Sequence, residues 1–216
     1  MSTAQPFVVP PGVIFQIEED GVTIENQGDV VLYTTFDRTL KRVVSAEGSV
    51  VLHAGVRAGM IHAAGNIQVA GDVYAENLLA GGTLQVQGSL QAASLQTGGN
   101  LEVGGQAQIP QAHVGGSAQV QGKLDSQDLS IGGDLSTGSI HAQSLHVGGN
   151  FHSQDATIQG AEIAGNLTIA GAAALGTLRA GTMAFGGNSI NARGLDRKST
   201  RLNSSHIPLS RMPSSA

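Results

Sequence analysis

Glycine recurs along this chain at a fixed interval of seventeen residues, which then shortens to sixteen. A period this short means that each repeat is one structural unit that cannot bury its apolar face alone, so neighbouring repeats must stack to form a continuous core. The chain is therefore predicted to be a solenoid, and its function is expected on the surface and at the ends of a rod. The glycines in this series are Gly48, Gly65, Gly82, Gly99, Gly116, Gly133, Gly149 and Gly165.

Apolar and polar residues alternate within each repeat. After Gly65, apolar residues form pairs two positions apart at 67 and 69, at 73 and 75, and at 78 and 80. Alternation with a period of two is typical of a strand with one buried face. Three strands of about four residues bring the chain back to its start about 4.8 Å further along the axis. The sequence predicts an all-β, three-sided parallel β-helix with about 17 residues per coil and roughly nine coils.

The glycine series is predicted to mark the corners of the coils. A sharp corner needs either a positive φ or a close approach to the coil below, and glycine meets both needs at low cost. The side chains expected to point inward are small, mainly Ala, Val, Ile and Leu. The interior is therefore expected to be narrow, with no room for a ligand.

The pattern divides the chain into three parts. Residues 1–27 contain larger apolar residues and prolines and are predicted to cap one end, because open β-helix ends expose unpaired strand edges. Residues 28–190 form the β-helix, whose first coil is predicted to hold a three-residue excursion around 37–42. The interval of 22 residues from Gly165 to Gly187 suggests an inserted segment. Residues 191–216 are predicted to be disordered.

The last residues differ from the rest of the chain in composition. From Asp196 onward Arg, Lys, Ser, Asn and Pro replace the glycine pattern. The string from Asp196 to His206 resembles the translation of the synthetic adapter used in short-read sequencing libraries, and 210–216 resemble its distal part. We therefore expect 196–216 to be non-native and the native chain to continue beyond Leu195.

Charge and composition exclude several classes of protein. Without 196–216 the chain holds seven basic and fifteen acidic residues, a net charge of −8. Only Arg57, Lys123 and Arg179 are basic between Gly48 and Ile190, so no basic groove is predicted and nucleic acid is not expected as a partner. There is no cysteine. No secretory signal or apolar span of eighteen residues is recognisable, which predicts a cytoplasmic location.

No set of residues predicts catalysis, a cofactor or a metal. His113 and His146 are predicted in one outward row with Ser130 between them, about 9.6 Å apart, which is too far to share a metal. Aspartates such as Asp72 and Asp134 fall near corners, where they are expected to bond to their own turn. They do not repeat at one register as a calcium solenoid requires. We expect the protein not to be an enzyme, and the six-residue repeat of β-helical acyltransferases is not kept.

The outer rows and the ends are the remaining candidates for function. Rows such as the one from Gln68 to Thr168 are polar and weakly charged, so they suit either plain solvated surface or sideways packing of rods. Aromatic residues gather near the ends, where they suit capping or end-to-end docking. The candidate self-assembly contacts are Phe7, Phe15, Tyr33, Phe36 and Phe185.

The repeat resembles that of the bactofilins, which are bacterial polymer-forming cytoskeletal proteins. The resemblance covers about residues 28–190 and is carried by the motif Gly-Asn/Asp-hydrophobic-x-hydrophobic at each position of the series. It implies a right-handed β-helix whose subunits join through their terminal coils into non-polar filaments without nucleotide. Its implied partners are further copies of itself, with a membrane surface or client proteins in addition. The structured-looking segment before residue 28 departs from the disordered tails usual in that family.

A self-assembling structural scaffold is therefore the favoured hypothesis. The alternative is a surface adhesin of the filamentous-haemagglutinin kind, which also builds long β-helices from Gly-Asn-Leu strands. Adhesins need export, and the start of this sequence shows no signal for it. An acyltransferase-like enzyme is the third possibility. The sequence that follows Leu195 would discriminate between the first two, since many further repeats favour an adhesin.

Overall fold

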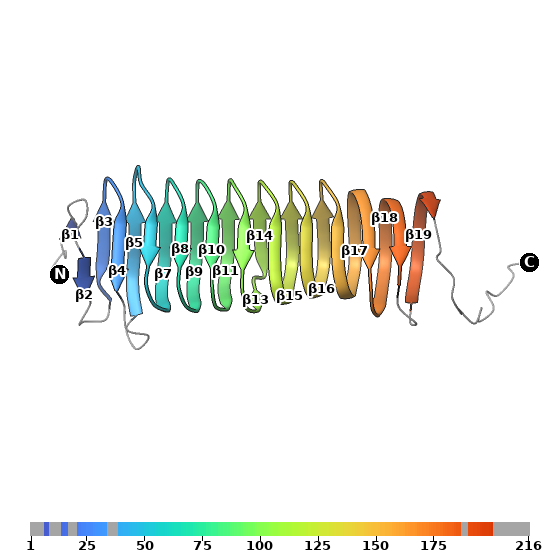
Figure 1. The fold of residues 1–216 in the computed structure, drawn as a ribbon, viewed down its shortest axis with the longest axis horizontal. Coiled ribbons are helices and arrows are strands. Elements are labelled where there is room, and N and C mark those ends of the chain that lie inside the picture. Colours follow the sequence, from blue (N-terminus) through green and yellow to red (C-terminus); the bar gives the residue numbers. More distant parts are fainter. Residues whose placement is uncertain (1–6, 9–13, 17–20, 34–38, 187–189, 201–216) are drawn as a thin grey trace, which may run out of the picture.

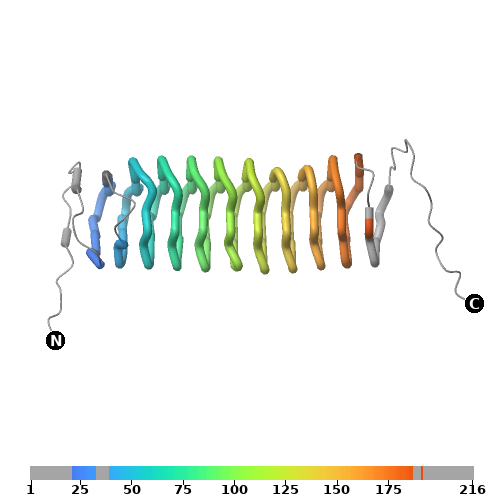
Figure 2. Tube along the Cα trace, turned by 90° about the horizontal axis from the view of Figure 1, so that it is seen from below, coloured from blue at the N-terminus to red at the C-terminus, as the bar shows by residue number. Residues whose placement is uncertain are grey.

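The computed structural model describes residues 7–8, 14–16, 21–33, 39–186 and 190–200. They form a straight rod of stacked coils (Figure 1), with about nine turns and about 17 residues per coil. The prediction of an all-β parallel β-helix is confirmed, and the coils repeat at an even spacing along the rod (Figure 2).

The strands all belong to one continuous parallel sheet that winds around the rod. Each inner strand pairs with strands one coil earlier and one coil later, whereas the first two strands and the last one pair on one side only within the described residues. For example, Leu84 is aligned with Ile67 in the coil before and with Leu101 in the coil after. The strands are β1 (Phe7–Val8), β2 (Ile14–Gln16), β3 (Thr23–Asn26), β4 (Val30–Tyr33), β5 (Thr39–Ser45), β6 (Val50–Leu52), β7 (Val56–Ala63), β8 (Ile67–Val69), β9 (Val73–Ala80), β10 (Leu84–Val86), β11 (Leu90–Thr97), β12 (Leu101–Val103), β13 (Ala107–Gln108), β14 (Gln111–Val114), β15 (Ala118–Ile131), β16 (Leu135–Val147), β17 (Phe151–Ile169), β18 (Ala173–Phe185) and β19 (Ile190–Thr200).

The three predicted faces are present, but two of them share one strand. In the coil after Gly82, β10 forms the first face and β11 forms the second and third. Buried and exposed residues alternate along β11 except at Ala93 and Ser94, two consecutive residues that both face outward. Backbone pairing with the next coil continues on both sides of this corner. The second corner is therefore a bend within a strand.

The core consists almost entirely of stacked aliphatic side chains. Ile67, Leu84 and Leu101 lie above one another and are each at most 1% exposed. Phe151 is the largest fully buried side chain, stacked in register with Leu135. Burying such a side chain contributes about 1.5 to 3 kcal/mol. The core continues from Ile24 to Phe185 and gives the rod its stability.

The corner glycines are required by close approach between coils. Among the described residues, only Gly21 has a positive φ. A Cβ atom added to Gly99 would lie 2.9 Å from the carbonyl oxygen of Gly82, and one added to Gly165 would lie 2.6 Å from that of Gly149. Of the two reasons that the sequence offered for these glycines, the close approach is therefore the one that applies.

Three details of the predicted pattern are corrected. The glycine series continues after sixteen residues at Gly181, whose corner lies against Gly165, so no segment is inserted before Gly187. In the first coil, residues 41–42 belong to the regular strand β5. The coil that begins at β4 has 20 residues, three more than the next coil, which has 17. The alignments place two of these three additional residues between β4 and β5 and one between β5 and β6.

The last strand extends beyond the predicted end of the β-helix. Strand β19 continues from Ile190 to Thr200, which includes residues 191–200 that were expected to be disordered. Its residues 190, 192 and 195 are aligned with Ala173, Leu175 and Leu178, which are buried in β18. Because the edge of β18 offers backbone donors and acceptors, an extended segment with apolar residues at this spacing can pair with it. Residues 201–216 lie outside the described residues.

Candidate functional site

Polar side chains form a ladder along the corner that follows each glycine of the series. The Oδ1 atom of Asn66 accepts a hydrogen bond at 2.7 Å from the backbone N–H of Thr83, one coil later. Asn100 accepts in the same way from Ser117 at 2.9 Å. In each of the other rungs, the side-chain oxygen of the earlier residue accepts a hydrogen bond from the backbone N–H of the later one. These pairs are Asp29 and Ser49, Ser49 and Asn66, Ser117 and Asp134, Asp134 and Asn150, and Asn150 and Asn166.

A shorter ladder of the same kind follows the corner between the first and second faces. Asp72 accepts a hydrogen bond at 2.6 Å from the backbone N–H of Ser89, and Asp155 accepts one at 2.7 Å from that of Ala172. The sequence predicted that corner aspartates bond to their own turns. Instead Asp72 and Asp155 connect consecutive coils, because stacked corners bring the N–H of the next coil within reach.

One outer row of the first face is joined by its own amide side chains. Gln68 donates a hydrogen bond to Gln85 at 3.3 Å, and Gln85 donates one to Glu102 at 3.1 Å. The alignments confirm the predicted row through Gln119, Ser136 and His152. The row is exposed and carries little charge.

The predicted histidine row is also present. His113, Ser130 and His146 are aligned in consecutive coils, and a shallow hollow of about 460 Å³ includes all three. His146 lies beside Glu162, with 3.7 Å between Nδ1 and Oε2. Within the described part of the chain, no group of three His, Cys, Asp or Glu residues has a geometry that could hold a metal ion.

The candidate self-assembly contacts are placed unequally. Phe185 is only 8% exposed and stacks in register with Ile169, so it belongs to the core near the last coils. The backbones of Phe7 and Phe15 pair with Ile24 and Leu32 in the first coils. The side chains of Phe7, Phe15 and Tyr33, and the whole of Phe36, lie outside the described residues.

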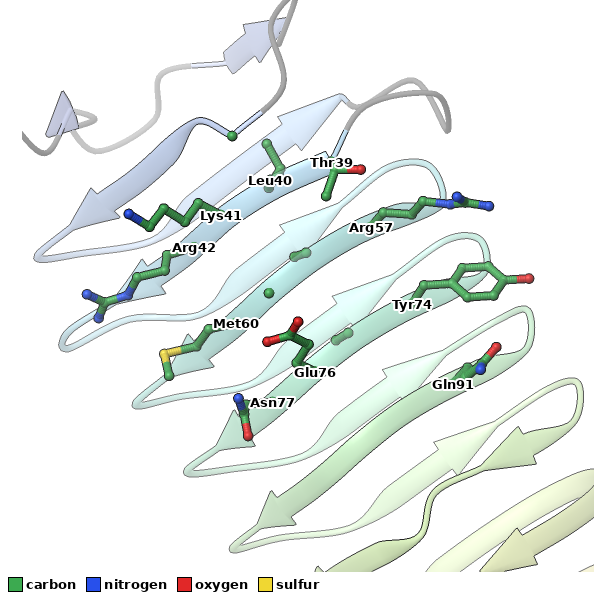
Figure 3. Close-up of a pocket in the computed structure, with 14 residues that line it drawn as sticks. Thr39, Leu40, Lys41, Arg42, Arg57, Met60, Tyr74, Glu76, Asn77 and Gln91 are labelled. Carbon is green, nitrogen blue, oxygen red and sulfur yellow. The ribbon is translucent and has the colours of Figure 1, made fainter. Parts of the chain in front are cut away.

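A hollow of about 850 Å³ lies on the side of the rod near its N-terminal end (Figure 3). It spans the outward residues of β5, β7 and β9 and reaches Gln91 on β11. Its floor lies at Gly59, which occupies the outward position between Lys41 in the coil before and Glu76 in the coil after. Because Gly59 has no side chain, the larger side chains around it enclose a recess.

The hollow is rich in positive charge. Lys41, Arg42 and Arg57 line it together with one carboxylate, Glu76. The guanidinium of Arg57 lies 5.1 Å from the centre of the Tyr74 ring, a cation–π contact on one side of the recess (Figure 3).

Arg42 and Lys41 differ in their neighbours. Arg42 forms an ion pair at 3.3 Å with Glu25, so part of its charge is compensated. Lys41 is exposed and makes no ion pair within the described part of the chain. A positive recess therefore lies on a chain whose net charge is −5.

Sequence reasoning missed this hollow. Gly59 is not part of the glycine series, and Lys41 and Arg42 were assigned to an irregular excursion. The available signal was the order Lys41, Gly59, Glu76 at one register, which becomes visible only when the first coil is aligned with an 18-residue offset.

The fold and its surface define a β-solenoid protein whose core is filled by its own side chains. No helix in the described part of the chain is long and apolar enough to cross a membrane. Comparisons with protein-family models, with curated proteins and with solved structures gave no match.

Proposed function

We propose that this chain is a self-assembling structural scaffold of the bactofilin kind, whose rods join through their terminal coils without nucleotide. The supporting observation is the pairing of the coils. An inner strand such as β10 pairs with one coil on each side, along the full length of its three residues. A terminal coil has such a neighbour on one side only, so a second copy can supply the other.

The filled core supports the same proposal. Inward residues from Ile24 to Phe185 occupy the interior, so the molecule offers its outer faces and its ends for interaction. A scaffold needs only shape and contact surfaces, and this proposal assigns the chain no enzymatic activity, cofactor or metal. We place the scaffold in the bacterial cytoplasm, with further copies of itself as the main partner. Client proteins and a membrane surface are the additional partners.

Electron microscopy tests the proposal directly. The complete native chain at micromolar concentration, without added nucleotide, is expected to form filaments whose axis follows the rod. Sedimentation should show a mass that increases with protein concentration. Particles that stay single rods across the whole concentration range would contradict the proposal.

A pair of variants tests whether the ends make the contact. Replacing both Phe7 and Phe15 by Ser is expected to reduce filament length, because these residues lie in strands that pair with the first coils. Leu79→Ser is the matched control, since Leu79 is an exposed apolar residue along the side of the rod. Equal filament lengths in the two variants would show that residues 7 and 15 do not form the junction.

The adhesin alternative shares the observed corner chemistry. Asn100 and Asn166 stand in Gly-Asn-Leu segments, and Asn100 accepts a hydrogen bond from the backbone N–H of Ser117 in the following coil. An adhesin requires a longer gene with many more coils and an export signal. Reading the genomic sequence on both sides of this chain decides between the two candidates.

A further inference from the structure

We propose that the hollow over Gly59 binds a short, acidic, extended peptide segment of a partner protein. This inference goes beyond the scaffold function, because a single rod can bind such a segment whether or not rods polymerise. Three features of the hollow lead to it: its charge, its apolar floor and its length.

Charge identifies the chemistry of the ligand. Lys41 and Arg42 line the recess on one side and Arg57 lines it on the other (Figure 3), whereas Lys123 and Arg179 lie on coils further along the rod. Counting Glu25, which pairs with Arg42, and Glu76, the recess keeps one net positive charge. Carboxylates are attracted to this place and repelled by most of the remaining acidic surface.

The floor of the hollow identifies a second requirement. Met60 and the partly buried Ala75 contribute apolar surface, and the ring of Tyr74, which is 37% exposed, adds more on the side away from Met60 (Figure 3). The stem of a long basic side chain adds further apolar area while its charged end stays in water. A ligand with one apolar side chain between acidic ones would cover this floor and still meet the cations at the rim.

Length favours a short peptide. The hollow covers five coil levels, from Gly21 to Gln91, which is about 19 Å at the spacing of neighbouring strands. Five to six residues of extended chain span about 17 to 20 Å. The ligand therefore has the size of a pentapeptide or hexapeptide.

A bilayer and a nucleic acid fit the hollow less well. A bilayer is flat, and the neighbouring first face carries the polar row from Gln68 to Glu102, which has no cation to meet lipid phosphates. Nucleic-acid backbones are bound by many cations that follow a groove, whereas this recess has three. Anionic vesicles are therefore used as a separate arm of the test.

The test measures the fluorescence anisotropy of a labelled pentapeptide, Asp-Glu-Leu-Asp-Glu, titrated with the full chain at low ionic strength. We expect saturable binding, and no binding of the neutral counterpart Asn-Gln-Leu-Asn-Gln. Exposed ion pairs are individually weak, so Lys41→Gln or Arg57→Gln alone should weaken binding by roughly threefold, and the two together by about tenfold.

The matched control removes the same amount of charge elsewhere. Lys123→Gln combined with Arg179→Gln changes the net charge equally but leaves the hollow intact, and it should bind the peptide like the original chain. Circular dichroism checks that both double variants keep their strands. If both double variants lose binding equally, or if the peptide does not bind at all, the proposal is wrong.

Vesicles containing phosphatidylserine provide the last arm. The original chain is expected to bind the peptide and not to sediment with these vesicles. If it sediments with them and the Lys41→Gln, Arg57→Gln variant does not, while the peptide shows no binding, the hollow recognises a membrane surface and the peptide proposal is overturned.

Discussion

The backbone N–H of Thr83 donates a hydrogen bond to Oδ1 of Asn66, which lies seventeen residues earlier and one coil below, at 2.7 Å. Every rung of this corner ladder has the same sense, with the oxygen on the earlier coil and the N–H on the later one. The ladder thus satisfies backbone donors at corners, where strand pairing is interrupted.

Asn66→Ala is expected to lower the thermal midpoint of unfolding. The variant removes the acceptor for the N–H of Thr83, and a hydrogen bond of this kind contributes about 0.5 to 1.5 kcal/mol. Gln68→Ala in the same coil is the control, because its exposed amide bond to Gln85 is long at 3.3 Å. A thermal melt followed by circular dichroism compares the two, and an equal effect would contradict a stabilising role for the ladder.

Gly99→Ala is expected to destabilise the rod, whereas Gly160→Ala is expected to be neutral or slightly stabilising. A Cβ at Gly99 would lie 2.9 Å from the carbonyl of Gly82, so two coils must move apart. At Gly160 the nearest atom, the oxygen of Gln143, is 3.7 Å away, which is an ordinary contact.

The cost at Gly99 should be about 1 to 3 kcal/mol, the range for overpacking in a tightly packed structure. The benefit at Gly160 should be at most about 1 kcal/mol, from the smaller entropy of the unfolded chain. Denaturant midpoints measured for both variants check this pair. A loss at Gly160 as large as that at Gly99 would show that spacing between coils does not decide the effect.

Ser45→Ala is expected to cost more than Thr97→Val, although both remove a buried hydroxyl. Ser45 donates to the carbonyl of Gly28 at 2.8 Å and accepts from the N–H of Gly48 at 3.0 Å, so its removal leaves a backbone donor without this partner. Thr97 donates to the carbonyl of Gly82, which also accepts from the N–H of Gly99.

A buried donor left without a partner costs about 1 to 3 kcal/mol, and because the bond to Gly48 is only partly buried we expect Ser45→Ala to fall at the lower end of that range. Thr97→Val should stay below about 1 kcal/mol, because the carbonyl keeps one partner and the methyl group keeps the volume. Thermal melts of the two variants provide the comparison. The reverse order would contradict this account of the buried hydroxyls.

Genomic DNA is expected to depart from the present sequence after the codon for Leu195. The segment from Asp196 to His206 resembles translated adapter sequence, so the native gene should encode a different continuation. A single genomic read across this position provides the measurement. Finding the same string there would contradict the interpretation and make the pairing of β19 with β18 a native feature.

The repeat length and the alternation of apolar residues were sufficient to predict the fold. Residues such as Ile67 and Val69 point inward because period-two patterning in a short strand leaves one face for the core. The intervals of seventeen and then sixteen residues fixed which residues stack, and the predicted row of His113, Ser130 and His146 follows from them. Both features depend only on spacing along the chain.

The candidate site could not be predicted in the same way. The hollow depends on the absence of a side chain at Gly59 between two long ones, and on an offset of 18 residues in the first coil. Likewise, the sequence does not reveal whether Asp72 bonds to its own turn or to the next coil, because both are within reach of a short side chain. Such features arise from contacts between coils, which a pattern within one coil does not contain.

The uniform sense of the corner ladder gives the rod a chemical polarity. A neighbour that joins in the same orientation can extend the ladder by presenting N–H groups to the last oxygens, whereas an inverted neighbour presents groups of the same kind. Any junction between two like ends must therefore replace this bonding with another contact. The two ends of the described ladder are therefore chemically unequal, even though the coils between them are nearly interchangeable.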